Sequence, residues 1–346
     1  MKRKVGVIGA GVIGLPTAVN IIENIPDVEV TLISEKFSPD TTGDGSAGWW
    51  EPYLIGDNPP LKMKRWGKAT WDHLTALLRS EIGADIGIQL VAGYNLFKTF
   101  QQAPDWKDEV LGFRQVSRDE LLQIFPADTG FNYGWAFTSL VTECSKYLPW
   151  LMKRFQKQGG RVQQRRVKTI GELVAEYDVV VNCTGVASYD LVNDKKVIPY
   201  KGQLIKVHAP WITMTYIFIG GAGSTTRYVI PVPGSDFVVL GGTADAGRWD
   251  TDIDPKDGSE IYKRCCKLMP SLKSAKIIGE WAGLRPGRSL VRLEREDMKF
   301  GPHTIPVVHN YGHGGSGVTL HWGCAQDATE LVRECLQERQ KIQSKL

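Results

Sequence analysis

The sequence contains little that would suit a membrane or a nucleic acid. No stretch of the 346 residues is apolar over the length of a membrane span, and acidic and basic residues are interspersed without forming a basic run. The formal net charge is only +4, so we expect neither a membrane protein nor a nucleic-acid-binding protein. An apolar run begins at residue 3, and we expect no room for a secretory signal before it. Internal repeats and low-complexity segments are absent as well.

Residue patterns that bind metals or perform nucleophilic catalysis are also missing. The cysteines form no CxxC pair with zinc spacing, and two of them are adjacent, which makes a poor disulfide framework. We therefore expect no metal site, and free thiols in a reducing compartment. No Ser-His-Asp arrangement or pair of carboxylates stands out. The cysteines are Cys144, Cys183, Cys265, Cys266, Cys324 and Cys335.

Glycine, in contrast, is abundant, with 37 residues, and it marks two loops near opposite ends of the chain. The first loop, GAGVIG over 9–14, follows an apolar run at 3–8 that predicts a buried parallel strand. Gly9, Gly11 and Gly14 form the GxGxxG pattern, which lets a pyrophosphate approach the positive end of the following helix. Glu35 ends a second strand at 28–34, where an acid can accept hydrogen bonds from ribose hydroxyls. The pattern predicts a dinucleotide and leaves FAD and NAD open.

The second loop, HNYGHGGSGVTLHWG over 309–323, leads into the last predicted helix. Its backbone N–H groups and the helix dipole can face the far end of a long cofactor. FAD suits this arrangement better than NAD, because its reduced ring system carries negative charge that a helix N-terminus stabilises. A crowded turn against the sheet would explain the same glycines, and both interpretations stay open at this point.

The strand patterns predict an α/β fold built from two domains. Continuous apolar strands of the parallel type recur in three separated pieces, whereas strands between them alternate and are punctuated by proline and glycine. We therefore expect a Rossmann-like FAD-binding domain formed by 1–55, 145–195 and 285–346. A mainly antiparallel β domain, formed by 56–144 and 196–284, is inserted into it and is expected to carry the substrate and any interface.

Several longer motifs resemble the D-amino-acid oxidase and D-aspartate oxidase family. They are VGVIGAGVIGLPTA, KFSPDTTGD, SAGWWEPYL, VAGYNLF, VLGFR, VVNCTG, GLRPGRSLVRLERE and VVHNYGHGGSGVTLHWG, and they extend over nearly the whole chain. The resemblance implies non-covalent FAD, oxidation of a D-amino acid to an imino acid, and reoxidation of the flavin by O₂ to give H₂O₂. It also implies that hydride transfers to flavin N5 without a protein base, so that orientation and electrostatics do the catalytic work.

The resemblance also assigns residues. Arg285 of GLRP is expected to bind the substrate carboxylate with its planar guanidinium. Tyr228 would add a hydrogen bond, the carbonyl of Gly315 would accept from the substrate amine, and Glu51 and Tyr53 would line the pocket. For FAD the expected residues are Gly9, Ala10, Gly11, Val12, Ile13, Gly14, Glu35, Lys36, Thr41, Thr42, Gly48, Val167, Gly312, Gly314, Gly315, Ser316, Gly317 and Thr319. His313 is expected to shape the flavin site without a catalytic role, and Arg288 and Arg292 to form structural salt bridges.

The preferred side chain of the substrate is less clear from these motifs. Glu51 stands where neutral-substrate oxidases usually carry Gln, and its charge would repel a second carboxylate, which favours neutral or basic D-amino acids. Overall similarity leans toward the aspartate oxidases, but the basic residue expected after GGT is Ala244. Arg227 and Arg248 could replace it. The lid carries Ser224 in place of a second tyrosine, which would open it to larger side chains.

Two other classes of function would leave part of these motifs unexplained. A nicotinamide dehydrogenase would not need the second loop, and a non-catalytic FAD-binding protein would not react with D-amino acids. The final residues Ser344, Lys345 and Leu346 match a peroxisomal address, which predicts recognition by the import receptor and a place in the peroxisomal matrix. A peroxide-producing oxidase would suit that compartment. A homodimer is a further expectation.

Overall fold

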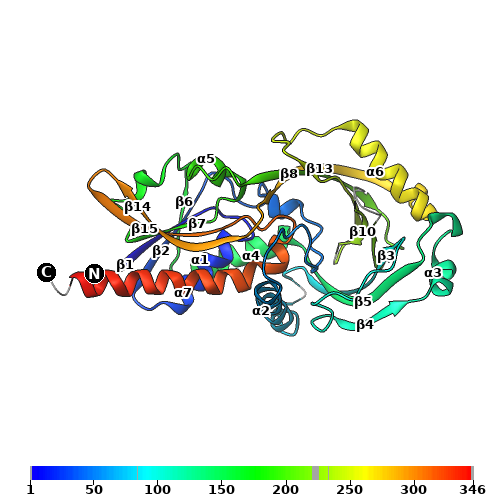
Figure 1. Cartoon of the computed structure of the whole chain (residues 1–346), viewed down its shortest axis with the longest axis horizontal. Helices are drawn as coiled ribbons and strands as arrows, with labels where there is room; N and C mark the ends of the chain where they lie inside the picture. The colour runs from blue at the N-terminus through cyan, green and yellow to red at the C-terminus, as the bar shows by residue number, and fades with distance from the viewer. Residues whose placement is uncertain (1, 84, 220–225, 233, 344–346) are drawn as a thin grey trace.

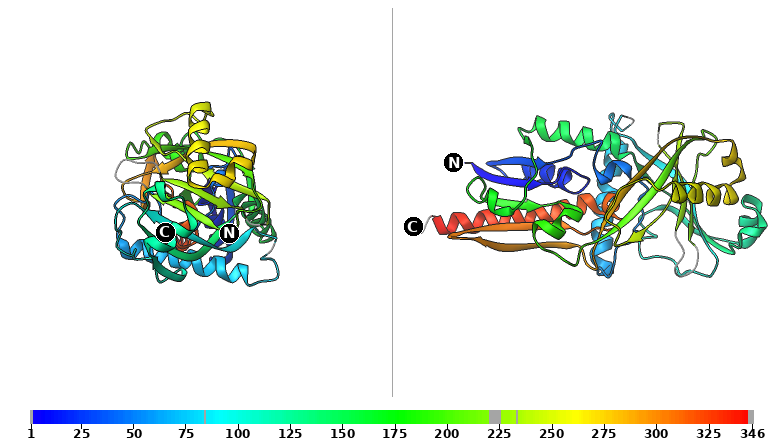
Figure 2. Two further views of the ribbon diagram at one scale, coloured as in Figure 1. Left: turned by 90° about the vertical axis from the view of Figure 1, so that its right-hand side faces the viewer. Right: turned by 90° about the horizontal axis from the view of Figure 1, so that it is seen from above.

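The computed structural model describes residues 2–83, 85–219, 226–232 and 234–343. The molecule is elongated, and each half is built on its own β-sheet (Figure 1). β1 begins and α7 ends at the same end of the molecule, as Figure 2 shows.

The first half contains a six-stranded sheet in the order β14-β15-β7-β1-β2-β6. All neighbouring strands are parallel except β14 and β15, which form an antiparallel hairpin. The central strands are almost completely buried, as their continuous apolar sequences predict. The strands are β1 (Arg3–Ile8), β2 (Val28–Ser34), β6 (Arg161–Gln164), β7 (Val179–Asn182), β14 (Arg292–Phe300) and β15 (His303–Tyr311).

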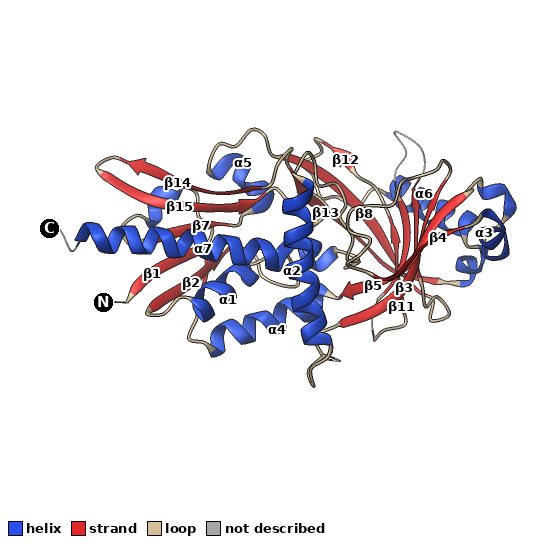
Figure 3. Ribbon diagram, turned by 60° about the horizontal axis from the view of Figure 1, so that its bottom comes forward, coloured by secondary structure: helices blue, strands red, loops and turns tan. Residues whose placement is uncertain are grey.

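Helices from distant parts of the chain cover one face of this sheet (Figure 3). α1 contacts both α4 and α7, and α7 contacts α2, so the first and last segments of the sequence lie side by side. Arg154 of α4 forms a bidentate ion pair with Glu23 of α1, in which both N–O distances are 2.7 Å. This ion pair joins the two helices. The helices are α1 (Gly14–Asn24), α2 (Pro60–Leu78), α4 (Cys144–Lys157) and α7 (Gly317–Gln343), with the short α5 (Ser188–Leu191) elsewhere in this half.

The second half is a nine-stranded, mainly antiparallel sheet in the order β12-β8-β11-β10-β9-β3-β5-β4, with β13 also paired to β8. β3 and β9 are parallel. One face packs Leu96, Phe218, Val229 and Leu240 in a core with α6. The strands are β3 (Ile88–Phe97), β4 (Leu111–Val116), β5 (Tyr133–Thr142), β8 (Ile198–His208), β9 (Thr215–Ile219), β10 (Arg227–Pro231), β11 (Phe237–Gly241), β12 (Asp245–Ala246) and β13 (Lys276–Gly287). The helices are α3 (Arg118–Ile124) and α6 (Pro255–Leu268).

The expected α/β fold is confirmed, and the strands expected at 3–8 and 28–34 have those bounds. The apolar segment PVVH at 306–309 is part of the longer strand β15, which forms a hairpin with β14. β14 is an edge strand rich in charged residues, so its sequence does not read as a buried strand. The proposed domain boundaries remain predictions, and β13 continues through the one at 285.

Candidate functional site

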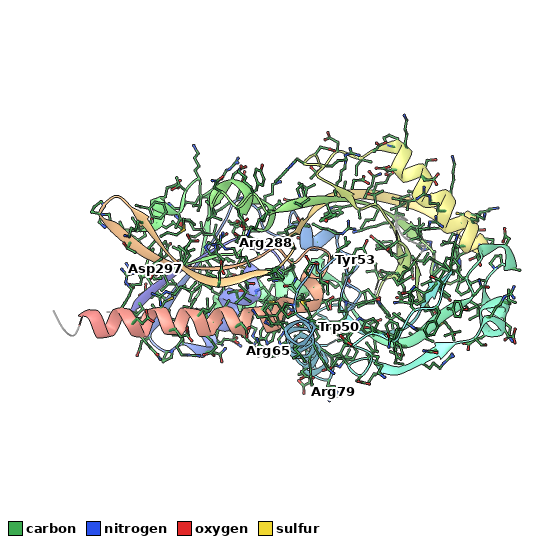
Figure 4. The ribbon with its side chains drawn as sticks, in the orientation of Figure 1. Trp50, Tyr53, Arg65, Arg79, Arg288 and Asp297 are labelled. Carbon is green, nitrogen blue, oxygen red and sulfur yellow. The ribbon has the colours of Figure 1, made fainter. Side chains whose placement is uncertain are left out.

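A cavity of about 1050 Å³ lies between the two sheets. Its walls combine the glycine loop after β1, the segment 39–53, the strands of the second sheet and the loop before α7. Tyr53 is labelled in Figure 4 between the two halves of the molecule, and it lines this cavity. The loops at 9–13 and 313–318, which are about 300 residues apart in the sequence, therefore meet at one site.

The first glycine loop forms one end of the cavity. Gly9, Ala10, Gly11, Val12 and Ile13 all line it. Gly14 does not, and its role is close packing: a Cβ there would lie 1.8 Å from the carbonyl oxygen of Gly9. The turn can therefore keep its tight shape at the start of α1, whose first N–H groups have no partner within the helix.

Six further residues expected to contact FAD separate into two groups. Lys36, Thr41, Thr42 and Gly48 line the cavity. Glu35 is not among the lining residues and lies 3.7 Å from the guanidinium of Arg166, with both side chains exposed. Val167 is also outside the lining. It packs against an apolar cluster that contains Ile8 of β1 and Ile33 of β2. The sequence assigned all six to FAD, and their contact with the cofactor remains a prediction.

The second glycine loop lies beside the first, because a Cβ at Gly317 would come within 3.2 Å of the Val12 side chain. Gly314, Gly315 and Gly317 line the cavity together with His313 and Val318. Gly312, Ser316 and Thr319 do not line it. The buried Ser316 and Thr319 instead hold the segment 51–53 through their hydroxyl groups.

Two hydroxyl groups near the start of α7 act as clamps on this segment. Ser316 Oγ accepts a hydrogen bond from the Tyr53 N–H at 2.6 Å and donates to the Tyr53 carbonyl at 2.8 Å. Thr319 Oγ1 donates to the Glu51 carbonyl at 2.9 Å and accepts from the Glu51 N–H at 3.3 Å. Glu51 and Tyr53 are thereby fixed relative to the second glycine loop.

His313 is a buried polar residue of the cavity wall. The side chain is buried in the cavity wall, and both ring nitrogens lack a hydrogen-bond partner among the described residues. Burial lowers the pKa of His313 to about 3, so the ring is neutral and offers one donor and one acceptor. Buried polar atoms are usually paired, so a bound group with polar atoms suits this position. The cavity shape, the two loops and His313 thus fit FAD.

A single row of residues crosses the second sheet, and four of its members, Ile217, Tyr228, Leu204 and Trp281, line the floor of the cavity. Each member is directly opposite the next in the strand register, so their side chains leave the same face of the sheet. In order across the sheet the row is Asn95, Ile217, Tyr228, Gly241, Leu204 and Trp281. Sequence reasoning found only Tyr228 in this row, because register between distant strands cannot be read from local patterns.

Arg285 and Tyr228 meet at one end of this floor. The Tyr228 ring lies over Gly241, where a Cβ would come within 1.9 Å of it, and the Arg285 guanidinium lies over Gly202 in the same way. Arg285 donates to the carbonyl of Thr243 at 2.9 Å, and its guanidinium carbon is 6.0 Å from the centre of the Tyr53 ring. Burial raises the pKa of Tyr228, so its hydroxyl stays protonated and can donate. The pair can hold a carboxylate.

Glu51 lies in the wall on the other side of the cavity. Its carboxylate accepts from Trp49 Nε1 at 2.9 Å and from Asn95 Nδ2 at 2.6 Å, and the described residues give it no ion pair. Burial raises the pKa of Glu51 to about 7, and the two hydrogen bonds offset only part of this increase. Glu51 is therefore a carboxyl group that changes charge close to neutral pH.

The two arginines considered as replacements for a basic residue at Ala244 lie away from this cavity. Arg227 leaves the opposite face of β10 from Tyr228, where burial and the charge of Arg264 lower its pKa. Arg248 pairs with Asp245, Asp250 and Asp257 at 3.8, 3.1 and 4.0 Å. Neither they nor Ala244 are among the described lining residues.

Two other arginines were expected to form structural salt bridges. Arg288 and Arg292 form ion pairs, as expected, with Asp194 at 3.0 and 4.0 Å. Figure 4 places Arg288 on the half that contains the six-stranded sheet.

The lid around Ser224 and the terminal Ser344–Leu346 lie outside the described residues. All six cysteines are free and buried. Within the described chain we find no helix that could cross a membrane and no cluster of three or more metal-binding side chains.

Comparison with known proteins identifies the class. Residues 4–331 match the model of the family described as FAD dependent oxidoreductase, and this chain belongs to that family. It is a flavoprotein oxidoreductase that uses FAD as its cofactor. A human protein named D-aspartate oxidase is 43% identical over 96% of this chain and 95% of its own length. A Dugesia ryukyuensis protein named D-amino acid oxidase is 34% identical over 96% and 98%.

The solved structures agree on the fold. The crystal structure of glycine oxidase from Geobacillus kaustophilus superposes with a TM-score of 0.76 at 17% identity, over 97% of this chain and 95% of that one. At this level of identity the likeness concerns the fold alone.

Proposed function

We propose that this protein oxidises D-amino acids to imino acids with FAD and O₂, and that it prefers neutral or basic side chains to acidic ones. The observation that carries the proposal is the position of Arg285 and Tyr228, a carboxylate-binding pair over the cavity floor. The relatives named D-aspartate oxidase and D-amino acid oxidase, at 34 to 43% identity over nearly their full lengths, support the choice of D-amino acids.

Substrate binding would depend on three groups of this chain. The guanidinium of Arg285 would bind the carboxylate in two places, with the Tyr228 hydroxyl as an additional donor. The carbonyl of Gly315 would accept a hydrogen bond from the substrate amine. Gly315 lies against the Tyr53 ring, since a Cβ there would come within 2.4 Å of the ring, so the loop and the ring together restrict where the amine can lie.

The chemistry needs orientation more than proton transfer by a side chain. When bound, FAD would supply a two-electron acceptor for the hydride that leaves the α-carbon, with O₂ as the final electron acceptor and H₂O₂ as its product. The residues of the cavity hold the α-carbon in place and exclude water. The helix dipole at the start of α7 favours negative charge at that end of the cavity. The imino acid then hydrolyses to a 2-oxo acid and ammonia.

The preference for neutral or basic side chains rests on what the cavity wall offers. Lys36 and Arg285 are its only Lys or Arg residues among the described lining, and Arg285 is needed for the α-carboxylate. The rest of the described lining is mostly apolar or uncharged, with Glu51 among its carboxyl groups. Above pH 7, where Glu51 is charged, a second carboxylate would be repelled.

A specificity for acidic D-amino acids is the alternative, and two observations favour it. The human relative named D-aspartate oxidase shares 43% of its residues with this chain. The pKa of about 7 also means that protonating Glu51 near neutral pH costs little free energy, so its repulsion can be removed. The full electrostatic cost of two adjacent carboxylates would therefore apply only at higher pH.

Substrate comparison tests the proposal directly. Oxygen uptake and H₂O₂ formation should be measured at pH 8 with D-alanine, D-arginine and D-aspartate and with the L-enantiomers. We expect the D-enantiomers alone to react, with D-alanine or D-arginine having a higher kcat/KM than D-aspartate. A higher kcat/KM for D-aspartate would transfer the proposal to acidic substrates.

We also propose that the protein works in the peroxisomal matrix, where the import receptor would recognise Ser344, Lys345 and Leu346. The support is the sequence of this tail and the peroxide that the proposed reaction produces. A homodimer remains a separate prediction, which sedimentation of the purified protein can test.

A further inference from the structure

Two ends of the cavity are chemically complementary to the two ends of a long basic amino acid. The anchor for the α-carboxylate, Arg285 with the Tyr228 ring, lies over β8 and β11. At the other end the carboxylate of Glu51 is held over β3 by Asn95. Both groups line the same cavity.

The strand register gives the spacing between the backbone positions beneath these two groups, Asn95 under Glu51 and Gly241 under the Tyr228 ring. β3, β9, β10 and β11 are consecutive neighbours in the sheet, so three strand spacings separate Asn95 from Gly241 beneath the Tyr228 ring. At the usual spacing this is about 14 Å along the floor. A short substrate bound at Arg285 would leave the Glu51 end of the cavity without a partner.

The floor between the two ends is apolar. Ile217 lies in the same row as Asn95 and Tyr228, and Ile219 and Ile230 also line the cavity. Lysine and arginine bury stems of about three or four methylene groups along such surfaces while their charged ends reach polar partners. The length and the apolar floor thus suit a stem that carries a cation at its far end.

The surroundings of the Glu51 carboxylate favour the binding of a cation. Its two protein partners, Trp49 Nε1 and Asn95 Nδ2, are neutral donors, and the described residues provide no positive charge within ion-pair distance. The other ionisable groups along the described cavity wall include Tyr53, Tyr228, His313 and Arg285. A partly buried carboxylate without a positive partner is unfavourable, and a cation from a ligand would remove that penalty.

We propose that Glu51 is the specificity-determining residue of this oxidase and binds the side-chain cation of D-lysine or D-arginine. This inference rests on the proposed oxidation of D-amino acids and names the substrate class within it. Glu51 would then contact the side chain of the substrate and not its reacting atoms.

D-lysine and D-norleucine provide the test, because their stems are alike and only D-lysine carries the distal cation. The ratio of their kcat/KM values should be measured for the holoenzyme, for Glu51→Gln and for Glu120→Gln. Glu120 pairs with Arg114 at 2.6 Å and contacts Tyr94, which leaves the other face of β3 from Asn95. Glu120 belongs to α3 and is not among the described lining residues, so Glu120→Gln removes a carboxylate that contacts β3 outside the cavity.

We expect the holoenzyme to favour D-lysine, and Glu51→Gln to lower the ratio by roughly tenfold to a hundredfold. Glu120→Gln should keep the ratio of the holoenzyme. The ratio should also rise as the pH increases through 7, and this rise should be absent in Glu51→Gln. A role of Glu51 in stability alone would not produce that pH profile.

The contrary outcomes are distinguishable. If D-norleucine is oxidised but Glu51→Gln lowers kcat/KM equally for both substrates, the carboxylate acts on their common α-amine and the inference is wrong. If D-aspartate is preferred to D-lysine above pH 7, it is also wrong. If no D-amino acid is oxidised, the proposed function itself fails.

Discussion

Glu51 illustrates how a single residue acquires unusual chemistry from its surroundings. The motif WEPYL indicated that this side chain belongs to the pocket, and the cavity lining agrees with that position. Its neutral partners could not be predicted, because Asn95 comes from a strand whose register depends on long-range pairing. Its high pKa follows from that burial and not from any local sequence pattern.

The first prediction concerns stability and pH. The pKa of Glu51 rises from 4.5 to about 7 on folding, so the folded state holds this proton more tightly than the unfolded state. The associated stability is present below pH 4.5 and is lost as the pH rises through 7, a change on the order of 3 kcal/mol. Glu51→Gln removes this loss, and Asn95 can turn its unpaired Oδ1 toward the new amide.

Urea unfolding of the holoprotein at pH 5.5 and pH 8.5 measures this effect. We expect the wild type to lose more free energy of unfolding between these values than Glu51→Gln does. Equal losses in the two proteins would mean that Glu51 is not a buried titrating group.

The second prediction concerns Arg285. Arg285→Lys keeps the charge but loses the planar guanidinium that binds a carboxylate in two places. We expect FAD content to be retained and kcat/KM for the preferred D-amino acid to decrease by about ten- to a hundredfold. An unchanged kcat/KM would move the carboxylate site away from Arg285.

At the scale of elements, the two glycine loops were the parts of the site most visible in the sequence. Both lie at the start of a helix and both line the cavity, as their patterns predicted. The sequence did not predict the hydrogen bonds that join the second loop to the segment 51–53. Contact of Ser316 and Thr319 with FAD remains a prediction, and their hydroxyl groups hold the backbone of residues 51–53. Such contacts join segments more than 260 residues apart, which no local pattern reveals.

The third prediction tests the packing of the first loop. Gly14→Ala would place a methyl group against the backbone of Gly9, which cannot move without opening the turn. We expect the purified variant to contain much less FAD than the wild type, measured by the absorbance of released flavin. Gly279→Ala is the matched control, since a Cβ at Gly279 meets open space. A Gly14→Ala protein with full FAD content would contradict this role of the loop.

At the scale of the whole molecule, two sheets enclose one cavity, and residues from both ends of the chain meet there. The α/β class and the strands around the first loop could be predicted because parallel buried strands have continuous apolar sequences. The row across the second sheet and the β14–β15 hairpin could not. Both depend on pairings between distant strands. The charged residues of the edge strand β14 also lack the apolar pattern by which a buried strand is predicted.

The fourth prediction concerns the location of the molecule in the cell. A tagged protein that lacks residues 344–346 should be diffuse in the cytosol, whereas the complete chain should collect in peroxisomes. The purified truncated protein should keep its activity, because the cavity lining ends at Val318. Peroxisomal localisation of the truncated protein would indicate another signal.

The central claim is that D-amino acids reduce the FAD of this protein, and an anaerobic spectrum tests it most directly. The visible flavin absorbance of the purified holoprotein should be followed at pH 8 while D-arginine, D-alanine or D-aspartate is added without oxygen. The account predicts that D-arginine or D-alanine bleaches the flavin band faster than D-aspartate, that L-alanine has no effect, and that admitting air restores the band. A flavin band that no D-amino acid bleaches would contradict the account.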